Sequence, residues 1–185
     1  MELARTFVSF SSTDIGCYHM MRAWKAHEHI DFNFADFQLE EAVKSSNAYY
    51  IRSKCAEKIR RVDTFVLLIG TDTYTKTHFV KPEVEAAIEK GVRLIGVNLN
   101  YSRSKDALCP SFFGDKGALF VPFSPRILAE ALKWNKGTPT PGIPDDWYFP
   151  DSIYTNLGYK LVGNRAVLLP RPNPFAGGNR PPWAK

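Results

Sequence analysis

Two continuous apolar runs in the middle of the chain predict strands that are buried on both faces. The first run, Thr64–Ile69, ends at Gly70, and the second, Val92–Leu99, begins directly after Gly91. Uninterrupted runs of β-branched and aromatic residues are typical of parallel strands covered by helices on both sides. Parallel neighbours need a crossover connection, and the segment Lys81–Lys90 has the pattern of a helix that could provide it.

Shorter apolar runs extend the predicted sheet to five strands. The additional strands are Arg5–Phe10, Ile30–Phe34 and Ala118–Phe123. Pro122 places the last of these at an edge of the sheet or at a strand end. Helical patterns lie between the strands, at Ile15–Glu28, Ile51–Arg61 and Arg126–Trp134. This alternation predicts a three-layer, mostly parallel α/β fold over residues 1–136.

The remaining residues, 137–185, are expected to form a Pro-rich C-terminal extension. Nine of the thirteen prolines fall between Thr138 and Lys185. Within this extension, Tyr159–Val162 and Arg165–Leu169 flank Gly163-Asn164, a pair that favours the two-residue turn of a β-hairpin. Its aromatic residues predict that it packs on the domain, and a surface for a partner is the alternative.

Composition and charge limit the classes of partner. Hydrophobic residues make up 44% and charged residues 23% of the 185 residues, which is typical of a globular protein. The net charge of +5 favours anionic ligands such as nucleotides, and no basic stripe indicates nucleic-acid binding. The three cysteines and four histidines lack the spacing of metal ligands. No apolar stretch approaches 18 residues, so we expect a cytoplasmic protein without a membrane partner.

Glu83 is the most informative carboxylate of the chain. On a helix beginning near Lys81, the residues Val80, Val84, Ala87 and Ile88 share one apolar face, and Glu83 lies at the edge of that face. This position predicts a half-buried carboxylate near the carboxyl end of the preceding strand, where ligands bind in open α/β sheets. The alternative is an acidic residue that only complements the helix dipole.

Three polar loops follow predicted strands, and parallel strands bring their carboxyl ends to one rim of a sheet. The loops are Ser11–Asp14, Ala35–Phe37 and Thr71–Thr77. With Glu83 they gather the candidate residues Phe10, Ser11, Asp14, Asp36, Thr71, Asp72 and Tyr74. The sequence has no P-loop, GxGxxG, HExxH or GxSxG motif, which weighs against a classical dehydrogenase or NTPase.

The motifs at this rim resemble those of TIR domains. F-V-S-F-x-x-x-D at Phe7–Asp14 is similar to the opening strand and loop of that family. T-Y-x-x-x-x-F-V-x-x-E, which ends at Glu83, is similar to the segment that carries the family's catalytic Glu, with Phe79 where many TIR domains have Trp and with Pro82 as a further departure. The following A-I-E-K-G and apolar strand most resemble the ThsB-type TIR-like proteins of bacterial Thoeris anti-phage systems. The resemblance covers roughly residues 4–134.

This resemblance implies a flavodoxin-like sheet and NAD⁺ as substrate, with no bound cofactor. Such enzymes cut the nicotinamide–ribose bond and make an ADP-ribose-derived signal that activates a separate effector, and many assemble into homo-oligomers on activation. Carried over by position, Glu83 is the catalytic carboxylate, and Phe10, Ser11 and Asp14 are first-loop residues near the nucleotide. Asp36 falls in the second loop. Tyr74 or Phe10 would be the aromatic wall for the leaving ring.

Each of these residues also has a purely structural interpretation. Phe10 could be a core residue, Ser11 a turn residue, Asp14 a helix cap and Asp36 an ordinary loop acid. Two alternatives to the enzyme also remain open. The first is a non-catalytic TIR-like adaptor that acts by protein–protein assembly, and the second is a nucleotide-binding receptor without turnover.

Overall fold

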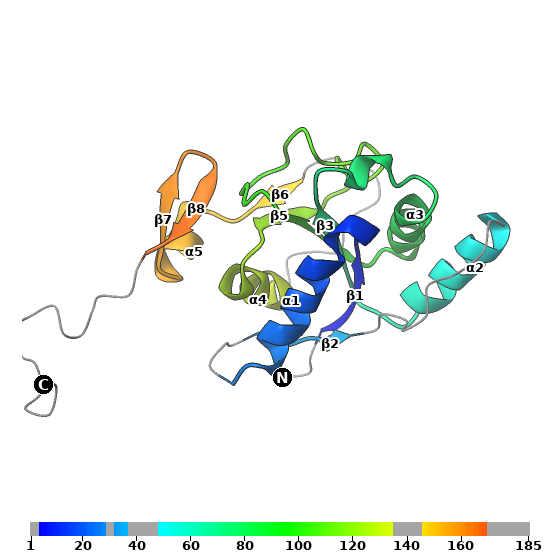
Figure 1. Cartoon of the computed structure of the whole chain (residues 1–185), viewed down its shortest axis with the longest axis horizontal. Helices are drawn as coiled ribbons and strands as arrows, with labels where there is room; N and C mark the ends of the chain where they lie inside the picture. The colour runs from blue at the N-terminus through cyan, green and yellow to red at the C-terminus, as the bar shows by residue number, and fades with distance from the viewer. Residues whose placement is uncertain (1–3, 29–31, 37–47, 135–145, 170–185) are drawn as a thin grey trace, which may run out of the picture.

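A computed structural model of the chain describes residues 4–28, 32–36, 48–134 and 146–169. Its centre is a six-stranded sheet in the order β2-β1-β3-β4-β5-β6, in which every neighbouring pair is parallel (Figure 1). The strands are β1 (Arg5–Ser9), β2 (Ala35–Asp36), β3 (Thr64–Ile69), β4 (Arg93–Asn98), β5 (Leu119–Pro122) and β6 (Trp147–Tyr148). The order of the first five strands is that of a flavodoxin-like fold, as expected.

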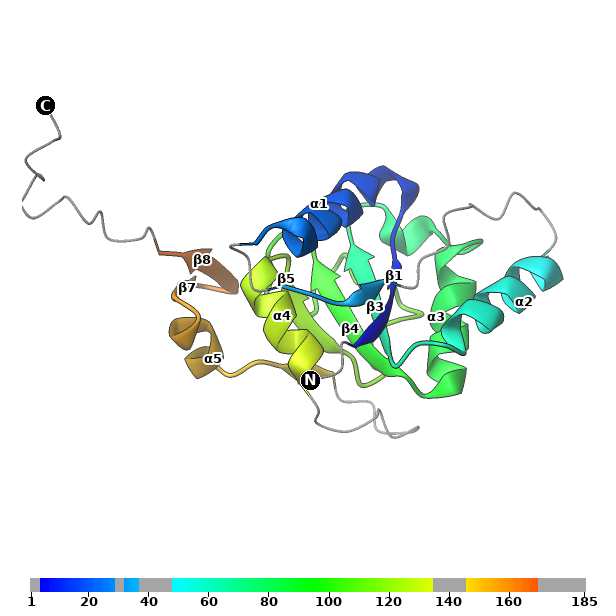
Figure 2. The ribbon, with the colours of Figure 1, turned by 90° about the horizontal axis from the view of Figure 1, so that it is seen from below.

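Helices cover both faces of this sheet, which gives the predicted three layers (Figure 2). α1 (Ile15–Ala26) and α4 (Pro125–Lys133) share one hydrophobic cluster with Val8, Val66 and Ile95 of the strands. α2 (Ala48–Ile59) and α3 (Val80–Lys90) share the other cluster with Phe7, Phe65 and Leu67. Alternate residues of β1 and β3 therefore enter opposite layers, and both strands are buried on both faces.

The predicted second strand, Ile30–Phe34, is wrong in position. Residues 32–34 are not in a strand, and β2 consists of Ala35–Asp36. Phe32 and Phe34 are both buried in the α1 layer, with their ring centroids 5.4 Å apart. The carbonyl of Phe34 accepts a hydrogen bond from Lys25 Nζ at 2.7 Å, which is a side-chain contact and not a strand partner. The aromatic–polar alternation thus reflects core packing of an irregular segment.

Helix α3 begins at Val80, one residue before the predicted start. Pro82 lies in its first turn, where a missing backbone N–H interrupts no helical hydrogen bond. Val80, Val84 and Ala87 are buried as predicted. The helix ends at Gly91, which has a φ of 72° and donates from its backbone N–H to the carbonyls of Ala87 and Ile88. A glycine suits this left-handed position because it has no Cβ to clash.

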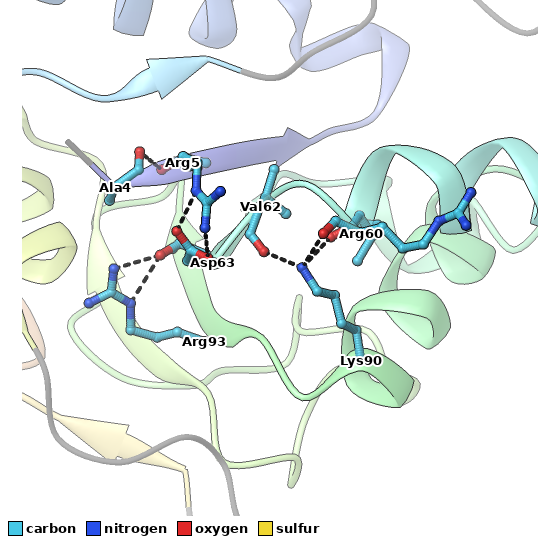
Figure 3. Close-up of polar contacts among 10 residues, drawn as sticks. Ala4, Arg5, Arg60, Val62, Asp63, Lys90 and Arg93 are labelled. Carbon is cyan, nitrogen blue, oxygen red and sulfur yellow. Dashed lines mark hydrogen bonds and ion pairs between the residues drawn. The ribbon is translucent and has the colours of Figure 1, made fainter. Parts of the chain in front are cut away.

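Cationic side chains link the elements at the amino ends of the strands (Figure 3). Arg5 donates two hydrogen bonds to Asp63, at 2.8 and 2.7 Å, and so links the start of β1 to the start of β3. Lys90 Nζ donates to the carbonyls of Ile59, Arg60 and Val62 at 2.9, 2.7 and 2.6 Å. Lys90 therefore ties the end of α3 to the end of α2.

Part of the C-terminal extension belongs to the same core. β6 pairs with β5 and adds a sixth strand that the sequence analysis did not predict. α5 (Asp151–Asn156) follows, and then the predicted hairpin, formed by β7 (Tyr159–Val162) and β8 (Arg165–Leu168). Phe149, Tyr154 and Tyr159 are buried in the cluster of α1 and α4. The expected boundary at residue 136 and the Pro-rich segment 170–185 lie outside the described residues.

Pro122 ends β5, which agrees with the second of its two predicted positions, a strand end. β5 is not an edge strand, because β6 pairs with it. Among the helices that the structure describes, none is long and apolar enough to cross a membrane.

Candidate active site

Glu83 points from the first turn of α3 toward the last residue of β1. Ser9 Oγ donates a hydrogen bond to Glu83 Oε2 at 2.7 Å, across 74 positions of sequence. Ser9 is 1% exposed, and Glu83 as a residue keeps partial exposure. The predicted half-buried carboxylate is therefore present near the carboxyl ends of β1 and β3.

The surroundings of this carboxylate favour its neutral form. Burial raises the pKa of Glu83 from 4.5 to about 7, while the hydrogen bond from Ser9 and the positive charge of Lys58 act in the opposite direction. Two residues of α2 take part in this environment, Lys58 and the buried Cys55. Burial, and secondarily the charge of Glu83, raise the pKa of the Cys55 thiol to about 12, so this thiol is neutral at physiological pH.

The first and third predicted loops do meet at this rim. Thr13 Oγ1 donates to Asp72 Oδ1 at 2.9 Å, and Lys76 pairs with the other oxygen of Asp72 at 2.9 Å. Thr73 is fully buried, and its hydroxyl accepts from the backbone N–H of Gly70 at 2.9 Å. These contacts hold the segments after β1 and β3 together.

Asp14 lies against Gly70, and its position excludes a larger residue there. A Cβ at residue 70 would lie 2.3 Å from Asp14 Oδ2. That oxygen is buried and has no hydrogen-bond partner among the described residues. Burial, and secondarily the charge of Asp72, raise the pKa of Asp14, with Thr73 and Lys76 opposing the shift. Although Asp14 precedes α1, its side chain makes no capping hydrogen bond, so the helix-cap interpretation is wrong.

Two other first-loop residues have mainly structural contacts. Ser11 is 1% exposed, and its Oγ lies 2.8 Å from Thr13 Oγ1 in the short 3-10 turn Ser12–Asp14. Phe10 stacks on Tyr18 of α1, with ring centroids 4.9 Å apart and 20° between the planes. Ser9 and Phe10 are directed to opposite layers of the sheet, so the structure does not bring Phe10 to Glu83.

The two remaining candidates lie in different places. Asp36 is in β2, and its backbone pairs with Thr6, three positions before Ser9 along β1. This register separates Asp36 from the level of Ser9 by about 10 Å along the strand. Tyr74 lies in the 3-10 turn Thr73–Thr75 and is 54% exposed. Phe79, which is 49% exposed, adds a second accessible aromatic ring to the same segment.

Sequence reasoning missed Ser9, Cys55 and Lys58. A signal for Ser9 was present, because residues 7 and 9 share one face of β1 and a hydroxyl in a buried layer needs a partner. No local pattern linked the two α2 residues to Glu83, because they come near it only through packing of α2 against α3. Across the part of the chain that the structure describes, no group of three or more His, Cys, Asp or Glu could hold a metal ion.

Comparison with known proteins identifies a family for this arrangement. A family model described as Thoeris protein ThsB, TIR-like domain, matches residues 7–104, which is more than half of the chain. The matched range contains Ser9, Asp14, Cys55, Lys58 and Glu83, and it ends before β5. A search of curated proteins found no match.

Proposed function

Because the chain belongs to the ThsB TIR-like family of Thoeris anti-phage defence, we propose that it consumes NAD⁺ and makes an ADP-ribose-derived signal for a separate effector. The observation that carries this proposal is the buried carboxylate of Glu83, which Ser9 holds at 2.7 Å near the carboxyl end of the sheet. This is the end of an open α/β sheet where nucleotides bind.

The chemistry needs few groups from the protein. Cleavage breaks the bond between ribose C1′ and the nicotinamide nitrogen, and the bonding electron pair leaves with nicotinamide as a neutral molecule. No general acid is required for this departure. The ribose becomes positively charged and oxocarbenium-like, as in glycoside hydrolysis. A fixed, ionised Glu83 stabilises that developing charge.

The second half of the reaction decides the product. If water attacks C1′, it forms ADP-ribose and releases one proton. If a hydroxyl or ring nitrogen of the ADP-ribose itself attacks, it forms a cyclic isomer, and a second molecule gives a conjugate. Each of these routes balances without an oxidant or a reductant, so the proposed reaction is a transfer of the ADP-ribosyl group.

Other rim residues support nucleotide binding. Asp14 Oδ2 is a buried acceptor that has no donor among the described residues, which suits a ribose hydroxyl. Tyr74 and Phe79 present exposed rings on which a nicotinamide or adenine base can stack. We propose Asp14 and Tyr74 as nucleotide contacts, with Ser11 holding the loop that carries Asp14. For Phe10 and Asp36, a role in nucleotide binding is supported only by their positions in the family motifs.

The direct test is release of nicotinamide from NAD⁺ by the purified full chain. We expect Glu83→Gln to lower kcat by at least about 100-fold, because an amide cannot supply the negative charge. Glu89→Gln changes an exposed residue of the same helix and should retain activity. Equal turnover by Glu83→Gln and the wild type would exclude the proposed role. If the wild type neither cleaves nor binds NAD⁺ alone or after assembly, the adaptor becomes the better interpretation, whereas tight binding without turnover would indicate a receptor.

A further inference from the structure

Ser9 is the residue through which the rigid sheet contacts the proposed catalytic carboxylate. It is the last residue of β1, and its backbone pairs with Leu67 in the middle layer. Two residues earlier, Phe7 stacks on Phe65 with ring centroids 5.8 Å apart. Backbone pairing and ring packing therefore fix the face of the sheet on which the Ser9 side chain lies.

Glu83 depends on this contact for its orientation. Among the described residues, Ser9 is the one side-chain hydrogen-bond partner of its carboxylate, and the bond goes to Oε2. The second oxygen, Oε1, accepts no hydrogen bond from these residues. A glutamate side chain has several freely rotating bonds, and a single short bond from a strand restricts them. One oxygen is thus held by Ser9, while the other has no hydrogen-bond donor among the described residues.

The same contact bears on the charge of Glu83. A carboxylate removed from water becomes neutral unless hydrogen bonds or cations compensate. Ser9 on β1 and Lys58 on α2 provide that compensation, and the nearby Cys55 thiol is neutral. Of the two favourable groups, Ser9 contributes the larger effect.

We propose that Ser9 is the positioning residue of Glu83, whose hydroxyl fixes Oε2, directs Oε1 toward the ribose and favours the ionised form of the carboxylate. This inference rests on the proposed function. It gives Ser9, at the end of β1, a role that needs a small side chain with a hydroxyl. The adjacent Phe10 and Ser11 have mainly structural contacts.

The test compares Ser9→Ala, Ser9→Thr and Ser152→Ala in the full chain. Ser152 is an exposed serine of α5, outside the proposed site, and serves as the control. Loss of one hydrogen bond to a charged group predicts a kcat lower by about 10- to 100-fold in Ser9→Ala. We expect the KM for NAD⁺ to change little, and the rise of kcat with pH to move upward by about one unit. Ser9→Thr keeps the hydroxyl and should restore most of the activity.

A second measurement separates this inference from the proposed function. The carboxyl carbon of Glu83, assigned by its absence in Glu83→Gln, can be followed by NMR during a pH titration without any substrate. The expected result is a higher titration midpoint in Ser9→Ala than in the wild type. An unchanged midpoint together with an unchanged kcat in Ser9→Ala would overturn the inference, even if the wild type is an active enzyme. An inactive wild type with a shifted midpoint would instead count against the proposed function.

Discussion

At the scale of single residues, the site places a carboxylate where folding alone would not favour one. Glu83 loses much of its hydration, and one serine and one lysine compensate only in part, so its pKa remains near 7. Catalytic carboxylates are often held in such environments because the charge that is costly in the free protein stabilises the transition state. The remaining free-energy cost of burying the charged carboxylate should be measurable as a pH dependence of the free energy of unfolding.

The free energy of unfolding should fall as the pH rises through about 7. The folded-state pKa of Glu83 lies above its usual value of 4.5, so the folded protein binds the proton more tightly than the unfolded chain. The stabilisation is fully present below about pH 4.5 and is lost as the pH rises through the folded-state pKa. The shift in the pKa of Glu83 corresponds to at most about 3 kcal/mol in the free energy of unfolding. Urea unfolding between pH 4.5 and 8 measures it.

The control for this measurement is Glu83→Gln, which removes the titrating group and should flatten the difference. Glu89→Gln, on the exposed side of the same helix, should follow the wild type. Parallel stability curves for the wild type and Glu83→Gln over this range would contradict the burial of the carboxylate.

The sequence could predict this site only in part. The helical period located Glu83, because an acidic residue at the edge of an apolar face has few places to point. The preference of Asp for helix N-caps gave the structural alternative for Asp14, but its carboxylate packs on Gly70 instead. Cys55 and Lys58 could not be found, because their electrostatic interaction with Glu83 depends on how α2 packs against α3.

At the scale of secondary-structure elements, the position of α2 determines the environment of Glu83. α2 carries Cys55 and Lys58, and its last turn is held by Lys90 of α3 (Figure 3). Desolvation lowers the pKa of Lys90, which indicates a partly enclosed cation. Three carbonyl acceptors for one ammonium group satisfy all of its donors.

Replacement of Lys90 by Met should loosen α2. The substitution keeps most of the apolar stem and removes the hydrogen-bond donor from three carbonyls, at a cost of about 1 kcal/mol because the group is partly exposed. Hydrogen exchange of the α2 amides should become faster, and the Tm should fall. Lys81→Met serves as the control, since the Lys81 ammonium makes an i,i+4 ion pair with Glu85 at 3.8 Å and, among the described residues, donates to no carbonyl of α2. Equal exchange in both variants would argue against the role of Lys90.

The strands show where the local pattern of apolar residues is sufficient to predict an element. β3 and β4 agree with the predicted apolar runs to within one residue, because a strand buried on both faces needs nearly every side chain to be apolar. The run at Ile30–Phe34 failed because Phe32 and Phe34 pack in the core from an irregular segment whose carbonyl binds Lys25. β6 is only two residues long and gives no periodic signal.

At the scale of the whole molecule, the described part of the extension is joined to the domain by burial and by polar contacts. Tyr154 of α5 is fully buried, and Arg103 lies over its ring at 4.5 Å. Asn164 at the hairpin turn donates to the hydroxyls of Ser102 and Ser104, both at 2.8 Å. The hairpin therefore packs on the segment that follows β4.

Truncation of Tyr154 should show that this packing stabilises the fold. Tyr154→Ala leaves a large cavity and should cost about 3–5 kcal/mol in the free energy of unfolding. Tyr154→Phe should be close to neutral, because the buried hydroxyl has no hydrogen-bond partner among the described residues. Chemical denaturation measures both variants. A small loss in Tyr154→Ala would indicate that residues 146–169 form an independent appendage.

The proposed role of Glu83 is NAD⁺ cleavage in anti-phage defence. The most direct measurement is the nucleotide content of cells that express the wild type or Glu83→Gln, by chromatography with mass detection, before and after infection. We expect nicotinamide and a new ADP-ribose derivative to appear only with the wild type, and the mass of that derivative identifies the signal class. Unchanged NAD⁺ in wild-type cells after infection would contradict the proposed role and leave Glu83 as a structural residue at a helix end.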